Sequence, residues 1–246
     1  MYCGGRFVRI EFALTNWSLN LSMRHCEELK TEYERDGFVV LRNYLPEDEL
    51  SQMRAQLEFF HSEVTEQRFR AVGTMKSMDK EHAWFRHYLE EGPHIPLMKF
   101  LLEDSISPDN VSWIAKPEGV TRTLPHFDAL GSYRRSSLGI SLWIALDRID
   151  RCNGCTHYEK GSHKREFEYV YPLRDYDEDN TNIFRLEVDP GDAVMHSTRT
   201  VHWSIDPLDD RERNAMVFAY WAGSSDIDPV RAEKSNSAYK DGTTVL

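Results

Sequence analysis

The stretch Leu138-Gly-Ile-Ser-Leu-Trp143-Ile-Ala-Leu146 is a mainly apolar run of strand length that ends at the polar Asp147. Similar short runs fill the second half of the chain, and turn residues such as Asn153-Gly154 separate them. These runs predict strands at 111–116, 138–146, 156–160, 183–188, 193–196 and 215–221. The second half of the chain is therefore expected to be rich in β-structure.

The first half carries helical periodicity. Residues 27–35 read as a helix that ends at Gly37, and residues 46–65 read as a second helix, with a short β-rich run at 38–42 between them. We expect a mobile loop or lid at the polar segment 66–92 and another helix at 94–103. Helices first and strands after, without βαβ alternation, favour an antiparallel double-sheet barrel flanked by helices.

Length and charge limit the class of protein. The chain has 246 residues, long enough for one large β-rich domain. We expect that domain at 23–246, preceded by an extension at 1–22 of uncertain order. With 41 acidic and 30 basic residues the formal charge is −11, which argues against nucleic-acid binding. The sequence has no apolar run of membrane-spanning length and no signal-peptide core, so we expect no membrane association and a cytoplasmic location.

Two short segments contain residues suited to metal binding: Pro125-His126-Phe127-Asp128 and Thr200-Val201-His202-Trp203-Ser204. On an extended strand, His126 and Asp128 would point to the same face. A distant histidine, either His202 or His196, could complete a set of two histidines and one carboxylate. Such a set holds non-haem Fe(II) and leaves positions open for a co-substrate and oxygen.

Several ordered motifs surround these segments. They are the run from Ser137 to Asp147, Cys152-Asn-Gly-Cys155 followed by Gly161-Ser-His163, Asp189-Pro-Gly-Asp192 followed by His196, and Arg211-Glu-Arg213. Together with the opening Tyr33-Glu-Arg-Asp-Gly-Phe-Val-Val-Leu-Arg-Asn-Tyr-Leu-Pro46, they resemble the phytanoyl-CoA dioxygenase-like family of Fe(II)/2-oxoglutarate oxygenases. The resemblance covers residues 25 to 222 approximately.

The resemblance implies a double-stranded β-helix, the jelly-roll core of cupin-like proteins. It implies His126, Asp128 and His202 as iron ligands, because Ser204 and Arg213 then take the family's spacing after the second histidine. His196 is the alternative ligand. The implied cofactors are Fe(II), 2-oxoglutarate as co-substrate, and O2.

The same resemblance assigns the co-substrate site. Arg213 opens an apolar strand, and its guanidinium can hold the distal carboxylate of 2-oxoglutarate in a two-pronged contact; Arg211 is the competing candidate. Ser204 would add a hydrogen bond, and Trp143 matches a tryptophan that lines the site. Tyr133, Arg134 and Arg135 follow the first ligands and are candidates for substrate contact.

The implied activity is oxidation of an unactivated C–H bond in a small metabolite or natural product, with hydroxylation favoured and succinate and CO2 as co-products. Halogenases of this kind replace the ligand carboxylate with a small residue, whereas Asp128 is present here. A cupin-like metal isomerase or lyase and a non-catalytic binding module are the alternatives, but neither needs Arg213 and Ser204 at this spacing. We expect a monomer or homodimer.

Cys152 and Cys155, with His157 and His163 nearby, also fit a zinc site by spacing. We favour a structural role for the cysteines, because an Asn-Gly turn separates them and only the second position recurs in the family. His157 and His163, like His87 and His94, receive no assigned role.

Overall fold

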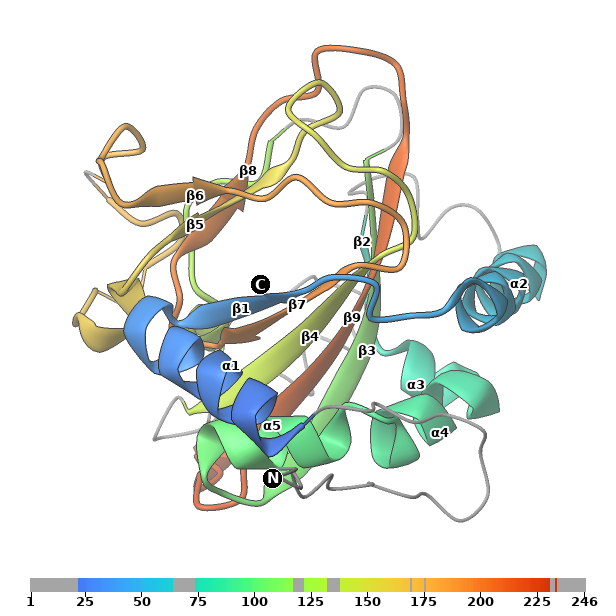
Figure 1. The fold of residues 1–246 in the computed structure, drawn as a ribbon, viewed down its shortest axis with the longest axis horizontal. Coiled ribbons are helices and arrows are strands. Elements are labelled where there is room, and N and C mark those ends of the chain that lie inside the picture. The colour runs from blue at the N-terminus through green and yellow to red at the C-terminus, as the bar shows by residue number, and fades with distance from the viewer. Residues whose placement is uncertain are drawn as a thin grey trace, which may run out of the picture.

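In the computed structural model, the described residues form nine strands in two antiparallel sheets (Figure 1). The structure describes residues 22–63, 74–116, 122–131, 138–168, 170–174, 176–230 and 233. The major sheet has the order β1-β7-β4-β9-β3-β2, and the minor sheet has the order β6-β5-β8. Their bounds are β1 Phe38–Leu41, β2 Thr74–Met75, β3 Ile106–Lys116, β4 Gly139–Ala145, β5 Thr156–Glu159, β6 Ile183–Arg185, β7 Ala193–Ser197, β8 His202–Ser204 and β9 Arg213–Ala222.

The chain passes between the two sheets as it runs toward β9. From β4 in the major sheet it enters β5 and β6 in the minor sheet, returns to β7, crosses to β8 and ends in β9. This path is that of a double-stranded β-helix, so the predicted jelly-roll core is confirmed. The predicted turn at Asn153-Gly154 carries the chain from β4 to β5, with Gly154 at a φ of 83°.

Strand β4 is apolar on both faces because both faces are buried. Ile140, Leu142 and Ile144 pack into the core beneath the helices, whereas Trp143 and Ala145 pack into the space between the sheets. Because both faces are covered, all seven residues of the strand are buried, and the polar alternation of a half-exposed strand is absent.

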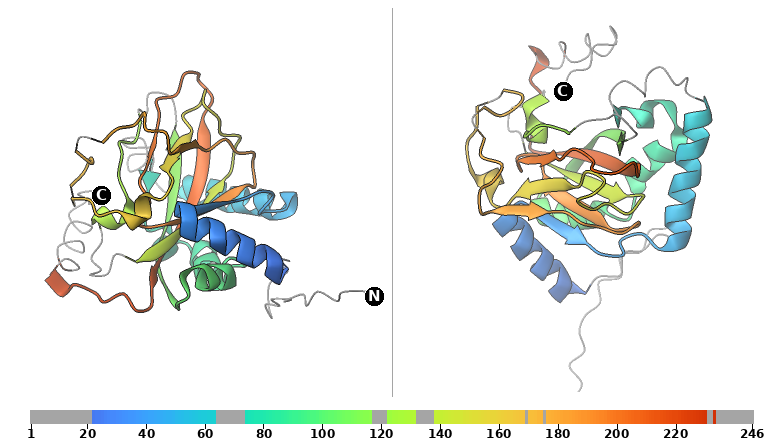
Figure 2. Two further views of the ribbon diagram at one scale, coloured as in Figure 1. Left: turned by 60° about the vertical axis from the view of Figure 1, so that its left-hand side comes forward. Right: turned by 90° about the horizontal axis from the view of Figure 1, so that it is seen from above.

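Helices cover the face of the major sheet that points away from the minor sheet (Figure 1). They are α1 Met23–Asp36, α2 Glu47–Glu63, α3 Met78–Glu81, α4 Ala83–Glu91 and α5 Ile95–Leu102. Seen from above in Figure 2, the strands lie between α1 and α2. The predicted helices at 27–35, 46–65 and 94–103 are thus present, and Gly37 ends α1 in the left-handed region at a φ of 86°. No described helix is long and apolar enough to cross a membrane.

One expectation about this half of the chain is wrong. The segment 66–92, expected as a loop or lid, contains β2, α3 and α4 in its described part, 74–92. Phe85, Tyr88 and Leu89 fall at helical spacing and are buried against the sheet. The polar and charged residues between them obscured this periodicity in the sequence. Strand β3 also begins earlier than predicted, at Ile106, because a register irregularity at Pro108 to Asn110 lets the ladder continue past the proline.

Candidate metal centre

His126 and His202 lie side by side and form an isolated antiparallel β-bridge. The two residues exchange backbone hydrogen bonds, His126 N to His202 O at 3.0 Å and His202 N to His126 O at 2.8 Å. Their ring centroids are 4.3 Å apart. The chain between 126 and 128 does not continue as a strand, because Asp128 begins a 3₁₀ turn, Asp128–Gly131. The expectation that His126 and Asp128 share one face of an extended strand is therefore wrong, and the turn brings the carboxylate beside the histidines instead.

The three side chains form a compact donor set. One ligand atom from each of His126, Asp128 and His202 lies within 4.8 Å of the others, and this is the one such group among the residues that the structure describes. Two imidazole nitrogens and one carboxylate oxygen at this separation fit a divalent transition metal, which they would hold from one side. The residues that the sequence singled out as ligands are thus brought together, with His202 rather than His196 in the third place.

Hydrogen bonds fix which nitrogen of each histidine is free. His126 Nδ1 lies 2.8 Å from the Leu124 carbonyl oxygen, and His202 Nδ1 lies 2.9 Å from the Thr200 carbonyl oxygen. A carbonyl only accepts, so Nδ1 donates in both rings and Nε2 keeps the lone pair that a metal needs. Burial lowers the pKa of His126 below its usual value and lowers the pKa of His202 to about 3. Both rings are therefore neutral at physiological pH.

Asp128 is held by one of its two oxygens. Oδ2 accepts hydrogen bonds from Ser141 Oγ at 2.9 Å and from His196 Nε2 at 3.1 Å, whereas Oδ1 lies 3.5 Å from His202 Nε2. Burial is the largest influence on the pKa of Asp128 and opposes its ionisation. The His196 hydrogen bond, together with the electrostatic influence of the three neighbouring histidines, outweighs burial, and the pKa of the carboxyl stays below its usual value. The carboxylate is charged, and Oδ1 is the oxygen left for a metal.

Arg213 supplies a buried positive charge at the start of the last strand. It is the first residue of β9 and is 2% exposed. Nη2 donates to the Gly154 carbonyl oxygen at 3.0 Å, while Nε and Nη1 have no hydrogen-bond partner among the described residues. Burial lowers the pKa of Arg213 to about 10, so the guanidinium remains charged at neutral pH. A buried cation with unused donors can bind an anion.

The other residues expected at the co-substrate site are also buried. Ser204 Oγ accepts from Thr123 N at 2.9 Å, which leaves its hydroxyl hydrogen free to donate. Trp143 packs between the sheets with Tyr158 and Ala215. Arg211 instead lies at the surface in ion pairs with Asp150 and Asp209, which removes it as the competing candidate.

Tyr158 contacts the candidate ligand His202 and the neighbouring His196, and the sequence analysis did not single it out. Its ring stacks on His202, with centroids 5.6 Å apart, and its hydroxyl lies 3.3 Å from His196 Nδ1. Tyr158 and Thr156 share the inner face of β5. The only sequence signal was this position in a short strand facing the second histidine segment.

Tyr133, Arg134 and Arg135, expected to contact substrate, lie outside the described residues. The ring of Tyr171 meets that of His126 edge-on, with centroids 5.9 Å apart, and Tyr171 is 39% exposed.

The two cysteines differ in environment. Cys155 is buried between the sheets, where burial raises its thiol pKa to about 11, and Cys152 is exposed. A high pKa disfavours the thiolate that zinc binds.

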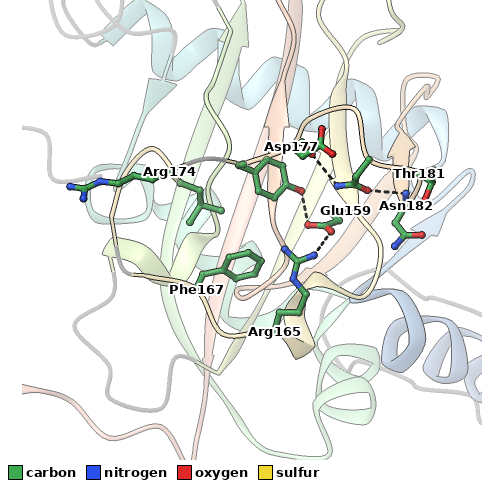
Figure 3. A pocket seen from close by; sticks show the side chains of 10 residues that line it. Glu159, Arg165, Phe167, Arg174, Asp177, Thr181 and Asn182 are labelled. Atoms are coloured by element: carbon green, nitrogen blue, oxygen red, sulfur yellow. Dashed lines mark hydrogen bonds and ion pairs between the residues drawn. The ribbon is translucent and has the colours of Figure 1, made fainter.

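A separate pocket of about 390 Å³ lies on the outer side of the minor sheet (Figure 3). It centres on Glu159, which follows Tyr158 in β5 and so faces the opposite side of the strand. The carboxylate is bound by Arg165 and by the Tyr176 hydroxyl at 2.6 Å. None of the candidate metal or co-substrate residues lines this pocket.

A jelly roll that carries two histidines and one carboxylate has the arrangement found in the class of non-haem iron oxygenases. Comparison with known proteins narrows the class. The chain belongs to the phytanoyl-CoA dioxygenase (PhyH) family, whose model matches residues 33–215.

One curated relative is the peroxisomal phytanoyl-CoA dioxygenase of Mus musculus, 24% identical over 80% of this chain. The match spans 66% of that relative's length, just under two thirds. Among solved structures, the 2-oxoglutarate-dependent carbocyclase SnoK from nogalamycin biosynthesis has a TM-score of 0.72 and 22% identity, over 85% of this chain and 87% of that one. The epimerase SnoN, in complex with Fe3+, alpha ketoglutarate and nogalamycin RO, has a TM-score of 0.72 and 18% identity, over 83% and 86%. These structures share the fold.

Proposed function

We propose that this protein is an Fe(II)- and 2-oxoglutarate-dependent dioxygenase that hydroxylates an unactivated C–H bond of a small metabolite or natural product. The observation that carries the proposal is the donor set of His126, Asp128 and His202, with ligand atoms within 4.8 Å of one another. Membership of the PhyH family and the Fe3+ and 2-oxoglutarate complex of SnoN support the same cofactors.

The side chains take distinct roles in this proposal. The Nε2 atoms of His126 and His202 and Oδ1 of Asp128 would hold Fe(II) on one side. Arg213 would bind the distal carboxylate of 2-oxoglutarate, with Ser204 donating a further hydrogen bond and Trp143 lining the space between. When bound, the metal and co-substrate would supply an oxidant made from O2, with one oxygen atom entering succinate and the other the product. The protein positions the reactants and excludes water.

Hydroxylation is the outcome favoured by Asp128, because the carboxylate fills the position that a halide needs in halogenases. The neighbours SnoN and SnoK are described as an epimerase and a carbocyclase, so one fold carries several outcomes. Mass analysis of the product decides between them: hydroxylation adds one oxygen atom, ring closure removes two hydrogen atoms, and epimerisation leaves the mass unchanged. Monomeric or dimeric state and cytoplasmic location stay predictions.

A test that needs no substrate uses slow 2-oxoglutarate decarboxylation by the resting enzyme. Wild-type protein with Fe(II) and O2 should produce succinate, and the anaerobic Fe(II) protein should show a charge-transfer band when 2-oxoglutarate is added. His126→Ala and His202→Ala should each abolish both signals, because two remaining ligands hold iron poorly.

The matched variant His196→Ala should keep turnover at high Fe(II), with roughly 10–100-fold weaker metal binding. If His196→Ala is inactive while His202→Ala is active, the ligand choice is wrong and the enzyme class stands. If wild-type protein neither consumes nor binds 2-oxoglutarate with Fe(II), the proposed function fails and a metal isomerase, a lyase or a binding module becomes the better interpretation.

A further inference from the structure

Tyr158 contacts the candidate ligand His202 directly and the candidate ligand Asp128 through His196. It is 1% exposed, and its ring stacks on Phe38 at 4.8 Å as well as on His202. Its hydroxyl lies 3.3 Å from His196 Nδ1. Ring packing explains why an aromatic residue fits here, but packing does not explain a buried hydroxyl aimed at a histidine nitrogen, since phenylalanine would fill the same space.

His196 uses both ring nitrogens. Nε2 lies 3.1 Å from Asp128 Oδ2, and an ionised carboxylate only accepts, so Nε2 carries the hydrogen. In the neutral ring Nδ1 is then an acceptor, and the Tyr158 hydroxyl is the donor that satisfies it. The Tyr158 hydroxyl therefore selects the tautomer in which His196 can donate to Asp128. His196 is 2% exposed, so it has little contact with bulk water.

The sheet holds these contacts in register. In the ladder of the major sheet, His196 on β7 lies directly between Phe38 on β1 and Ser141 on β4. The three residues share one face, so Ser141 and His196 both reach Asp128 Oδ2 while Phe38 supports Tyr158. Asp128 needs this support, because it sits in a 3₁₀ turn and its side chain is 31% exposed.

We propose that Tyr158 and His196 are positioning residues of the metal site: Tyr158 donates to His196, His196 donates to Asp128 Oδ2, and Oδ1 is thereby kept as the one carboxylate oxygen that faces the metal. The inference rests on the proposed function only in that the three ligands bind a divalent metal. Without the Tyr158 hydroxyl, His196 can rotate or change tautomer, and Asp128 is free to turn its second oxygen toward the metal and occupy a position that 2-oxoglutarate needs.

The test compares two Tyr→Phe variants of the same chemistry. Tyr158→Phe removes the hydroxyl beside His196 Nδ1, and Tyr44→Phe removes a buried hydroxyl 3.4 Å from His94 Nδ1, on the helix side of the major sheet. We expect both to lose some thermal stability. Only Tyr158→Phe should weaken Co2+ and anaerobic Fe2+ binding, by about three- to tenfold, and alter the d–d spectrum of bound Co2+. Equal metal affinity in Tyr158→Phe and wild type would overturn the inference.

A double-variant cycle tests whether the hydroxyl acts through His196. His196→Ala alone should weaken Co2+ binding by roughly 10–100-fold, and adding Tyr158→Phe should weaken it no further. Additive effects would show that Tyr158 acts on the metal independently, and the inference would fail. A wild-type protein that binds Co2+ but not 2-oxoglutarate would contradict the proposed function alone. A wild-type protein that binds neither Co2+ nor Fe2+ would contradict both the proposed function and the inference about Tyr158.

Discussion

Arg213 carries a charge into the space between the sheets and leaves two of its donor nitrogens, Nε and Nη1, without a partner among the described residues. Burying an unpaired charge destabilises a fold, so this arginine has a cost that a bound carboxylate would offset. If Arg213 binds the co-substrate as proposed, function and stability oppose each other at this residue, as expected for a binding site that is formed before its ligand arrives.

Arg213→Met tests whether Arg213 lowers the stability of the free protein while it raises the affinity for 2-oxoglutarate. Without 2-oxoglutarate, the variant should be as stable as the wild type or more stable by about 1–3 kcal/mol, because methionine fills the space without a buried charge. Its affinity for 2-oxoglutarate should fall by about 2–5 kcal/mol, and Fe(II) binding should be unchanged. Urea denaturation with and without 2-oxoglutarate measures the first two effects.

Arg211→Met is the matched control, since Arg211 is a surface residue paired with Asp150. It should change stability by less than about 1 kcal/mol and leave 2-oxoglutarate binding intact. If instead Arg213→Met destabilises the free protein strongly and keeps 2-oxoglutarate affinity, Arg213 is a structural residue and the co-substrate assignment is wrong.

At the scale of elements, His94 joins helices α4 and α5 to strand β9. It is fully buried, its Nε2 contacts the Tyr220 hydroxyl, and that hydroxyl donates to the Leu89 carbonyl oxygen at 2.8 Å. Burial lowers the pKa of His94 to about 3. The helical layer thus depends on a histidine that must stay neutral.

This gives a pH dependence with a defined sign. An unfolded histidine has a pKa of about 6.5, so between about pH 6.5 and pH 3 the unfolded chain binds a proton at His94 that the folded protein does not. The His94 contribution is fully present above about pH 6.5 and falls by about 1.4 kcal/mol per pH unit below it. In metal-free His94→Gln, the unfolding free energy should decline less between pH 7 and pH 5 than in the wild type. The difference in slope should correspond to about one proton fewer taken up on unfolding.

Equal slopes for His94→Gln and the wild type in urea denaturation would show that His94 takes up a proton without unfolding.

The same elements show what the sequence could predict. Strand β1, the strands from β3 to β7, strand β9 and the helices α1, α2 and α5 follow from their apolar periods, whereas the three-residue strand β8 was not predicted. The candidate residues His126, Asp128, His202, Arg213 and Ser204 come from the resemblance of their motifs to those of the family. The helix α4 was missed because its apolar residues stand among charges, and the turn at Asp128 was missed because H-x-D reads equally well as strand. The contact of Tyr158 with His196 joins β5 to β7 across the two sheets, and no local pattern encodes such a contact.

At the scale of the whole molecule, one continuous core ties α1, α2, α4 and α5 to the major sheet, and a second core fills the space between the sheets. Strands β1, β7 and β4 contribute residues to both cores, so neither can come apart without disturbing the other. The predicted single domain at 23–246 should therefore unfold in one cooperative transition.

The expected start of that domain can be placed more closely. Ser22 is the N-cap of α1, and its side chain accepts a hydrogen bond from His25 N at 3.2 Å. A chain of residues 22–246 should keep full metal and 2-oxoglutarate affinity and melt in one transition. A chain that begins at Met23 should lose about 1 kcal/mol by removal of the cap, which lowers the melting temperature by about 2–4 °C. Ser22→Ala in the full-length chain should show the same loss, since it removes the same hydrogen bond. Two separate melting transitions would contradict the single domain, and a fall in 2-oxoglutarate affinity on removal of residues 1–21 would show that the extension contributes to the site.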